Sequence, residues 1–282
     1  LFVSGCASIP QQLVLVNKES GLATSKTPGA CAPEKLYQSD IGPVSSWHIM
    51  DASNISLLNW NIYKEQRDNW SADFLKHSAG QNIIVLQEAL LNQQLHNLLS
   101  DKKLHWNLNT AFYLNDIETG VMTASTVKPI YKCGLRTTEP LIRTPKTTLI
   151  SRFQLSDTDE HLLVANIHGF NFSIGTEVLA QQIKTMTKIL SKNHGPLIIA
   201  GDFNNWSDDR VDIVDNMAKE LRLHAVSYKN HNRIKLFGNA IDHVFYRQLE
   251  LMTQNTIKVT SSDHNPIKVT FKTVDNNLAR KR

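Results

Sequence analysis

The sequence predicts one α+β domain in which two packed, mostly antiparallel sheets are flanked by helices. Short apolar runs of strand length, rich in β-branched residues, recur between residues 55 and 271. Amphipathic stretches of helix length lie between them. Two of the apolar runs flank a short polar segment, which indicates an antiparallel hairpin. A hairpin among mixed helices and strands argues against a purely parallel βαβ fold.

Seven segments are expected to form strands because they are short, apolar and β-branched. They are Ile55–Ile62, Ile83–Leu86, Thr147–Leu155, His161–Ile167, Leu197–Ala200, Ala240–Tyr246 and Pro266–Phe271. The hairpin joins Thr147–Leu155 to His161–Ile167 through the polar sequence SDTDE.

Two segments repeat apolar residues at intervals of three or four positions, as a helix with one buried face does. These segments are Glu177–Ser191 and Asp208–Leu221. Thr176 and Ser207 precede them and could cap their first turns.

The composition favours one large core, since 41% of the 282 residues are hydrophobic. A formal net charge of +4 suits a phosphate-bearing ligand without demanding nucleic acid. No stretch approaches the 18 apolar residues of a membrane span. The sequence indicates no protein partner, and we expect a monomer.

The first residues, LFVSGCAS, are typical of the end of an apolar signal segment. Val3–Cys6 resembles a bacterial lipobox, in which small residues admit the cleaving peptidase and the cysteine then carries acyl chains. We therefore expect a protein held by lipid on Cys6 at the periplasmic side of a bacterial cell envelope. A chance Ser-Gly-Cys sequence is the alternative.

The domain boundaries follow from these features and from composition. Residues 1–6 are expected to be the end of the signal segment, and 7–47, with scattered Pro, Gly and Ser, a tether. The main domain is expected at 48–275, followed by a basic tail at 276–282. In an oxidising compartment Cys31 and Cys133 could form a disulfide or remain two unrelated thiols, and the sequence leaves both alternatives open.

Several apolar strands end in a carboxylate, an amide or an imidazole. These ends are Asn61 in LLNWNIYK, Gln87 and Glu88 in IIVLQEA, His168 and Asn171 in VANIHGFN, Asp202 and Asn204 in LIIAGDFN, Asp242 in AIDHVF, and Asp263 and His264 before NPIKVTF. Taken singly, the GDFN and SDHN pieces could be an ordinary turn and a cap. Glu88 is harder to dismiss, because a buried carboxylate needs a cation or donors to compensate its lost hydration.

Together these pieces resemble the endonuclease/exonuclease/phosphatase superfamily, which includes DNase I, abasic-site endonucleases, inositol-polyphosphate phosphatases and neutral sphingomyelinases. The resemblance covers about Ile55 to Phe271 and depends on WN, QE, an H-x-x-N, GDFN, a D-H pair within a strand and SDHNP, in that order. The resemblance is greatest to the YafD-like bacterial group, through the segments WNIYKEQ, TGVMTAS, NIHGFNFSIG and GDFNNWS. The resemblance implies a DNase I-like four-layer α/β/β/α sandwich.

The resemblance also implies a metal site made of oxygen ligands. Glu88 would be the primary ligand of Mg²⁺, for which Mn²⁺ could substitute, and Asn61 would assist directly or through water. Asp263 would complete this site or bind a second ion.

Four further residues are implied in the hydrolytic step. Asp202 would orient or deprotonate the attacking water, and Asn204 would hold the phosphate or Asp202 itself. His264 would contact the scissile phosphate, while Asp242 would bond its other nitrogen and favour the imidazolium.

His168 would contact the phosphate or the leaving group, and Asn171 would donate to a phosphate oxygen. The implied phosphate-binding set is therefore Asn171, Asn204 and His264. His243 neighbours Asp242 in a predicted strand, where side chains alternate, and is expected to point away from the site.

These roles favour an Mg²⁺-dependent phosphodiester hydrolase, with nucleic acid as the leading substrate. A phospholipid, sphingomyelin or inositol-phosphate phosphoesterase is the alternative within this class. A non-catalytic envelope binding protein that keeps the fold is the alternative from another class. The sequence has no H-E-x-x-H or paired C-x-x-C motif, which argues against a zinc hydrolase.

Overall fold

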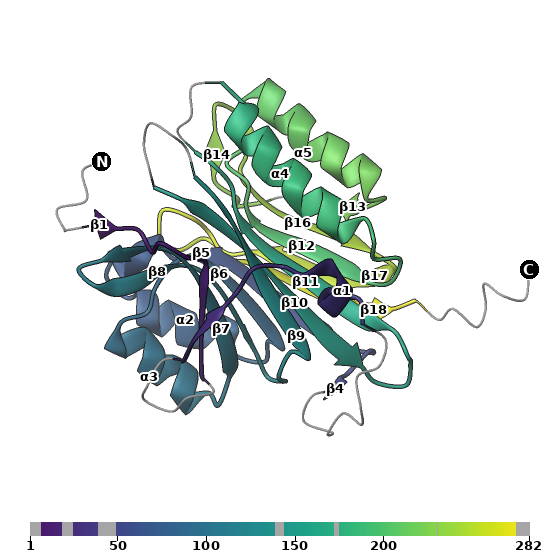
Figure 1. The fold of residues 1–282 in the computed structure, drawn as a ribbon, viewed down its shortest axis with the longest axis horizontal. Coiled ribbons are helices and arrows are strands. Elements are labelled where there is room, and N and C mark those ends of the chain that lie inside the picture. The colour runs from purple at the N-terminus through teal and green to yellow at the C-terminus, as the bar shows by residue number, and fades with distance from the viewer. Residues whose placement is uncertain are drawn as a thin grey trace, which may run out of the picture.

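A computed structural model describes residues 7–18, 25–38, 49–138, 144–171, 175–229 and 231–274 of the chain. Cys6 and the basic tail at 276–282 lie outside these residues. In the described part, two large sheets pack against each other and helices cover their outer faces (Figure 1).

The first sheet has nine strands, and all its neighbours are antiparallel except β5 and β6. In spatial order they are β17 (Leu249–Thr256), β18 (Ile267–Thr273), β5 (Ile55–Asn61), β6 (Ile83–Leu90), β8 (Ile117–Ser125), β7 (His105–Leu114), β2 (Val14–Asn17) and β3 (Ser25–Pro28), with β1 (Ala7–Ser8) also paired to β7. This sheet is mixed only at its centre.

The second sheet has seven strands. In spatial order they are β13 (His224–Ala225), β16 (Asp242–Arg247), β12 (Leu197–Asp202), β11 (His161–His168), β10 (Lys146–Leu155) and β4 (Ile49–Met50), with β9 (Tyr131–Thr137) also paired to β10. The antiparallel pairing of β10 with β11 confirms the predicted hairpin. A separate small hairpin joins β14 (Lys235–Leu236) to β15 (Asn239–Ala240).

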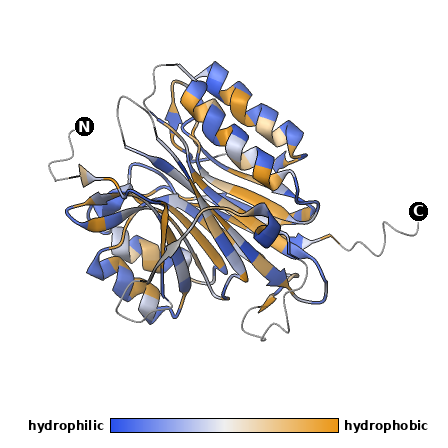
Figure 2. Cartoon of the chain, viewed as in Figure 1, coloured by the Kyte–Doolittle hydropathy of each residue, from blue (hydrophilic) through white to orange (hydrophobic). Residues whose placement is uncertain are grey.

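Helices cover the outer face of each sheet. The first sheet packs on α2 (Trp70–Ser78) and α3 (Gln93–Asp101), and the second on α4 (Glu177–Leu190) and α5 (Asp208–Glu220). Figure 2 shows that α4 and α5 carry both hydrophobic and hydrophilic residues, as helices with one buried face do. Two shorter helical elements are α1 (Pro33–Leu36) and the 3₁₀ turn η3 (Tyr63–Glu65).

The inner faces of the two sheets form one apolar layer between them. Strand residues such as Leu57 and Val85 from one sheet meet Val164 and Ile198 from the other, all fully buried. Their chain neighbours point outward to the helices, which follows from the alternation of side chains along a strand. The four-layer α/β/β/α prediction is therefore confirmed.

The predicted elements are all present, with small differences at their ends. The predicted strand Ile83–Leu86 continues to Leu90 because β6 resumes its pairing after an irregularity. Thr176 and Ser207 occupy the N-cap positions of α4 and α5. The prediction that they cap these helices is wrong, since neither makes a side-chain hydrogen bond to its helix.

The segment expected to be a tether instead extends the first sheet over much of its described length. Val14–Asn17 pairs with β7, and Leu15 and Val16 are buried. The Arg136 guanidinium binds the carbonyl oxygens of Pro10 and Gln12. The apolar sequence LVLV is strand-forming, and pairing with β7 satisfies its backbone.

The same arm is joined to the domain by a Cys31–Cys133 disulfide, one of the two alternatives that the sequence left open. The backbone beside it is also paired, since Ala30 bridges Gly134. The two cysteines are 102 residues apart in sequence. Closing so long a loop restricts the unfolded chain strongly.

We predict that the combined substitutions Cys31→Ser and Cys133→Ala lower the free energy of unfolding by about 2 to 5 kcal/mol, the range for loss of a native disulfide. Urea denaturation of the wild type with and without dithiothreitol measures the same quantity. The variant should not respond to dithiothreitol. Equal stability of the wild type in both conditions would contradict the prediction.

Candidate active site

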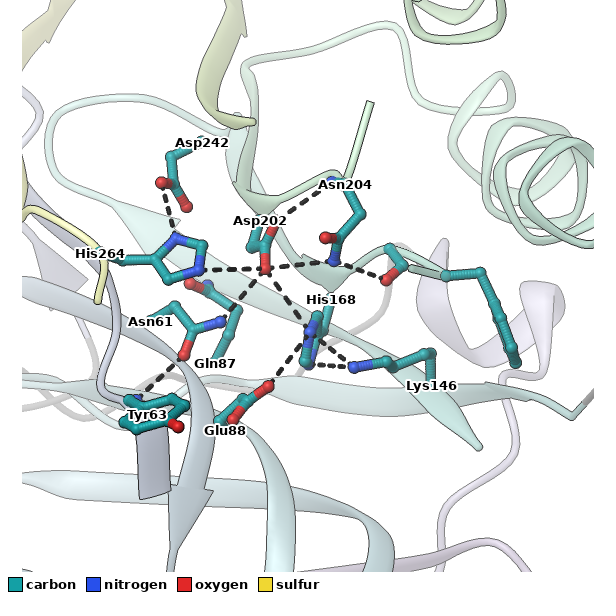
Figure 3. A network of polar contacts seen from close by, with 12 residues as sticks. Asn61, Tyr63, Gln87, Glu88, Lys146, His168, Asp202, Asn204, Asp242 and His264 are labelled. Carbon is teal, nitrogen blue, oxygen red and sulfur yellow. Dashed lines mark hydrogen bonds and ion pairs between the residues drawn. The ribbon is translucent and has the colours of Figure 1, made fainter. Parts of the chain in front are cut away.

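Polar side chains from the ends of strands of both sheets point toward one another (Figure 3). Asn61 ends β5 and Glu88 lies on β6, while His168 ends β11 and Asp202 ends β12. β5 is parallel to β6, and β11 is parallel to β12, so the carboxyl ends lie together within each pair. Asp242 begins the antiparallel β16 and is paired with Asp202. The topology thus gathers residues that are far apart in sequence.

Asp202 lies at the centre of this cluster and is only 2% exposed. Its Oδ2 accepts hydrogen bonds from Asn61 Nδ2 at 3.1 Å and from Asn204 Nδ2 at 3.2 Å. Its Oδ1 accepts the Asn204 backbone N–H at 3.0 Å. Burial raises the pKa of Asp202 to about 6, although the positive charge of His264 opposes this rise. The carboxylate is therefore held in place and can exchange a proton near neutral pH.

His264 lies between two carboxylates. Its Nδ1 is 2.8 Å from Asp242 Oδ2, and its Nε2 is 3.8 Å from Asp202 Oδ2. Burial alone would lower the pKa of His264, but the charges of Asp242 and Asp202 and the Asp242 hydrogen bond raise it to about 10. The backbone of His264 is fixed too, because its carbonyl accepts the indole N–H of Trp60. His264 is thus an imidazolium at neutral pH.

Glu88 reaches the site through an irregularity in β6. The pairing of β6 with β8 shifts register between Leu86 and Ala89, and Glu88 has a left-handed φ of 52°. Its carboxylate contacts the Lys64 ammonium, and its Oε1 is 3.7 Å from His168 Nε2. Burial would raise the pKa of Glu88, but nearby positive groups, Lys146 foremost, hold it at about 2. Glu88 is therefore ionised.

Lys146 is a site residue that the sequence reasoning missed. Lys146 is the first residue of β10, and its Nζ is 2.7 Å from His168 Nε2. Burial, followed by the charge of Lys146, lowers the pKa of His168 well below its ordinary value, so this imidazole is neutral. The signal was present, because extending the predicted hairpin from Thr148↔Ile167 by two residues places Lys146 beside the end of β11. Lys64, which lies in the sequence WNIYKEQ, is a second site residue that the sequence reasoning missed.

A buried amide network lies beneath the site and joins the two sheets. Gln87 Nε2 donates to Asn59 Oδ1 at 3.0 Å and to Asn166 Oδ1 at 2.7 Å. Asn166 Nδ2 in turn donates to the carbonyls of Leu86 and Met122, beside the irregularity that turns Glu88. The network fixes the backbone that presents Glu88.

Two predicted site residues lie less centrally. Among the described contacts, none joins Asn171 to the cluster, and its buried Oδ1 has no hydrogen-bond partner there. Asp263 precedes His264, accepts the Ser262 hydroxyl at 3.4 Å, and helps to raise the pKa of His264. His243 turns away as expected and lies within hydrogen-bond distance of the Ala240 carbonyl.

Two groups of side chains could hold a metal ion. One ligand atom each from Asp202, Asp242 and His264 lie within 4.8 Å of one another. A protonated His264 has no lone pair to offer an ion, so this trio is better described as a carboxylate–imidazolium–carboxylate chain. The carboxylate of Glu88 and the amide oxygen of Asn61 supply the hard oxygen donors that Mg²⁺ prefers. These donors fit such an ion, and Glu88 already contacts one cation, Lys64.

Comparisons with known proteins identify the family and the fold. Residues 58–264 match the model of the Endonuclease/Exonuclease/phosphatase family. A UPF0294 protein of Vibrio campbellii is 38% identical over 220 residues, which cover 77% of each chain. Among solved structures, D. rerio TDP2 has a TM-score of 0.61 at 15% identity and covers 78% of this chain and 100% of its own. The human Nocturnin catalytic domain has a TM-score of 0.60 at 15% identity, over 78% of this chain and 95% of its own.

We predict opposite protonation states for the two histidines of the cluster. In metal-free protein, His264 should keep its proton when the pH rises from 6 to 8, because its raised pKa lies near 10. His168 should remain neutral when the pH falls from 7 to 5. NMR of ring-labelled histidine measures both, with the signals assigned by His264→Gln and His168→Gln. Two histidines titrating together near pH 6.5 would contradict the prediction.

Proposed function

The chain belongs to the endonuclease/exonuclease/phosphatase family, and from this premise we propose that it is a divalent-metal-dependent phosphodiester hydrolase. The observation that carries the proposal is the buried Asp202 carboxylate, held by amides from both sheets beside the His264 imidazolium. A merely structural site would gain little from such a buried charge. Water activation and phosphate binding both need one.

Asp202 is the group that would orient and deprotonate the attacking water. Its hydrogen bonds to Asn61 and Asn204 fix the carboxylate plane, so the water meets a preset acceptor. A pKa of about 6 leaves Asp202 mostly ionised at neutral pH and still basic enough to accept a proton.

Positive groups close to Asp202 would bind the phosphate. His264 presents Nε2 as a charged donor, and Lys146 adds an ammonium close to His168. Both interact with the charge of Asp202, beside which negative charge would grow during in-line attack. Asn204 and Asn171 are the neutral donors proposed for the remaining phosphate oxygens.

Mg²⁺ is the proposed ion, with Mn²⁺ as a substitute, and Glu88, Asn61 and Asp263 are the residues that would hold it. When bound, such an ion neutralises phosphate charge and polarises the phosphoryl oxygen. Lys64 contacts the same Glu88 carboxylate, so it would have to give up at least part of this contact. It would then be free to meet a phosphate oxygen.

Nucleic acid is the proposed substrate. The net charge of +4 and the lysines at the site suit a polyanion. The structurally similar TDP2 was solved with a single strand DNA product, which supports the same substrate class here. We propose that the protein acts as a monomer, and a single strand suits an Asp202 carboxylate that is only 2% exposed.

We predict that the wild type cleaves DNA or RNA with Mg²⁺, that EDTA abolishes turnover, and that Asp202→Asn lowers kcat by about 10²- to 10⁴-fold. The same assay should include sphingomyelin, inositol phosphates and a bis-aryl phosphate. Asp215→Asn, on the exposed side of α5, is the matched control and should retain activity. Folded wild type that hydrolyses none of these substrates would instead support a binding protein.

We also propose that lipid on Cys6 holds the protein at the periplasmic face of a bacterial membrane. No helix in the described ranges is long and apolar enough to cross a bilayer, so the proposal depends on the lipobox-like sequence. Expression of the full-length chain with Cys6→Ser should shift it from the membrane fraction to the periplasmic extract. Unchanged membrane association would refute the lipid anchor.

A further inference from the structure

An aromatic ring stands exposed at the tip of the small β14–β15 hairpin. Phe237 is 80% exposed, whereas the next most exposed large apolar side chain in the described residues, Met252, is 49% exposed. The tip is a tight turn in which Phe237 and Gly238 have left-handed φ values of 50° and 91°. A non-glycine residue in this conformation is uncommon, so the turn holds the Phe237 backbone in a defined orientation.

The ring is supported from below. The Trp206 ring lies 5.7 Å from the Phe237 ring, and the Arg210 guanidinium lies 4.7 Å from the Trp206 ring. Arg210 is 1% exposed and donates to the carbonyls of Phe170 and Asn204. Asn239, on the second strand of the hairpin, donates to the Trp206 carbonyl at 3.3 Å. The exposed ring thus leans at 60° on the ring of Trp206, a residue that Arg210 and Asn239 contact in turn, and we call Phe237 and Trp206 the aromatic shelf.

The aromatic shelf adjoins the candidate active site along two chain segments. Trp206 follows the catalytic Asn204 by two residues, and the hairpin leads directly into Asp242. At its base, Ile241 pairs with Phe203, the residue between Asp202 and Asn204. With strands of only two residues, the tip lies about 10 Å beyond this base. Figure 1 shows β14 beyond the start of β16, and Asn239 donates to Asp208, the first residue of α5, at 3.4 Å.

We propose that Phe237 stacks on a nucleobase of the substrate, one or two nucleotides from the scissile phosphate. This inference rests on the proposed nuclease function and adds a binding subsite to it. A base needs one rigid ring with a free face, which the aromatic shelf provides. Lys235, exposed on the same hairpin, supplies a charge for the adjoining phosphate.

A lipid surface is a poorer fit to the same hairpin. Insertion into a bilayer gains from a broad apolar area, whereas only Leu236, 37% exposed, accompanies Phe237 at the tip. Gly238 and Asn239 follow directly. A small tip with a rigid ring favours stacking over insertion.

Binding of a short fluorescent single-stranded oligonucleotide, measured by anisotropy with Mg²⁺, tests the inference. All proteins carry Asp202→Asn so that the probe is not cleaved. We expect Phe237→Ala to weaken binding about 5- to 150-fold, as loss of one stacked base does. Phe237→Trp should retain affinity, whereas Phe237→Leu, which is apolar but has no ring, should lose it. Met252→Ala, on the edge strand β17, is the matched control and should change nothing.

An oligonucleotide with abasic sites in place of the bases beside the cleaved bond separates stacking from other effects. The difference in affinity between the parent protein and its Phe237→Ala variant should vanish with this probe. Wild-type affinity in Phe237→Ala, or full affinity in Phe237→Leu, would overturn the inference. Loss of binding to anionic phospholipid vesicles with unchanged oligonucleotide affinity would also overturn it, in favour of a membrane contact. Absence of any oligonucleotide binding or cleavage by the parent protein would instead overturn the proposed substrate class.

Discussion

The contact between Asn61 and Asp202 is the constraint on which the site depends, because it crosses from one sheet to the other. The apolar layer between the sheets supplies cohesion, but apolar contacts are not directional and tolerate sliding. A buried carboxylate is far less tolerant, since losing one donor leaves charge uncompensated at a cost of several kcal/mol. The amide network of Gln87, Asn59 and Asn166 adds a second directional link beneath it. Together these polar contacts fix how one sheet lies on the other.

That fixed arrangement makes one histidine of the site positively charged and the other neutral. His264 lies between Asp202 and Asp242, so its proton is stabilised despite burial. His168 lies against Lys146, and burial together with that cation keeps it neutral. A charged donor and a neutral imidazole therefore stand on either side of the same carboxylate. The difference comes entirely from neighbours, since both rings are almost equally buried.

Much of this arrangement could be predicted from sequence, and the exceptions have physical reasons. Polar residues at the ends of short apolar strands were informative because parallel neighbours bring their ends together, as with His168 and Asp202 in one sheet and Asn61 and Gln87 in the other. The irregularity that turns Glu88 could not be predicted, because it depends on the register with β8, a strand whose mixed sequence gave no clear alternation. The arm around Val14–Asn17 was missed because a four-residue strand gains its stability from pairing with β7 and not from its own pattern. Lys64 was missed because three consecutive left-handed residues, Tyr63 to Glu65, point it inward.

Arg210 connects the loop that follows β12 to the surface that would receive substrate. One buried guanidinium holds the carbonyls of Phe170 and Asn204 while its plane lies near the Trp206 ring. Trp206 in turn contacts Phe237, so the residue that holds the Asn204 carbonyl also packs against the ring on which Phe237 leans. A base resting on that ring would be placed at a fixed distance from the water-activating carboxylate, without a contact between the two. Substrate alignment and catalytic geometry would then have a common origin in the packing around a single cation.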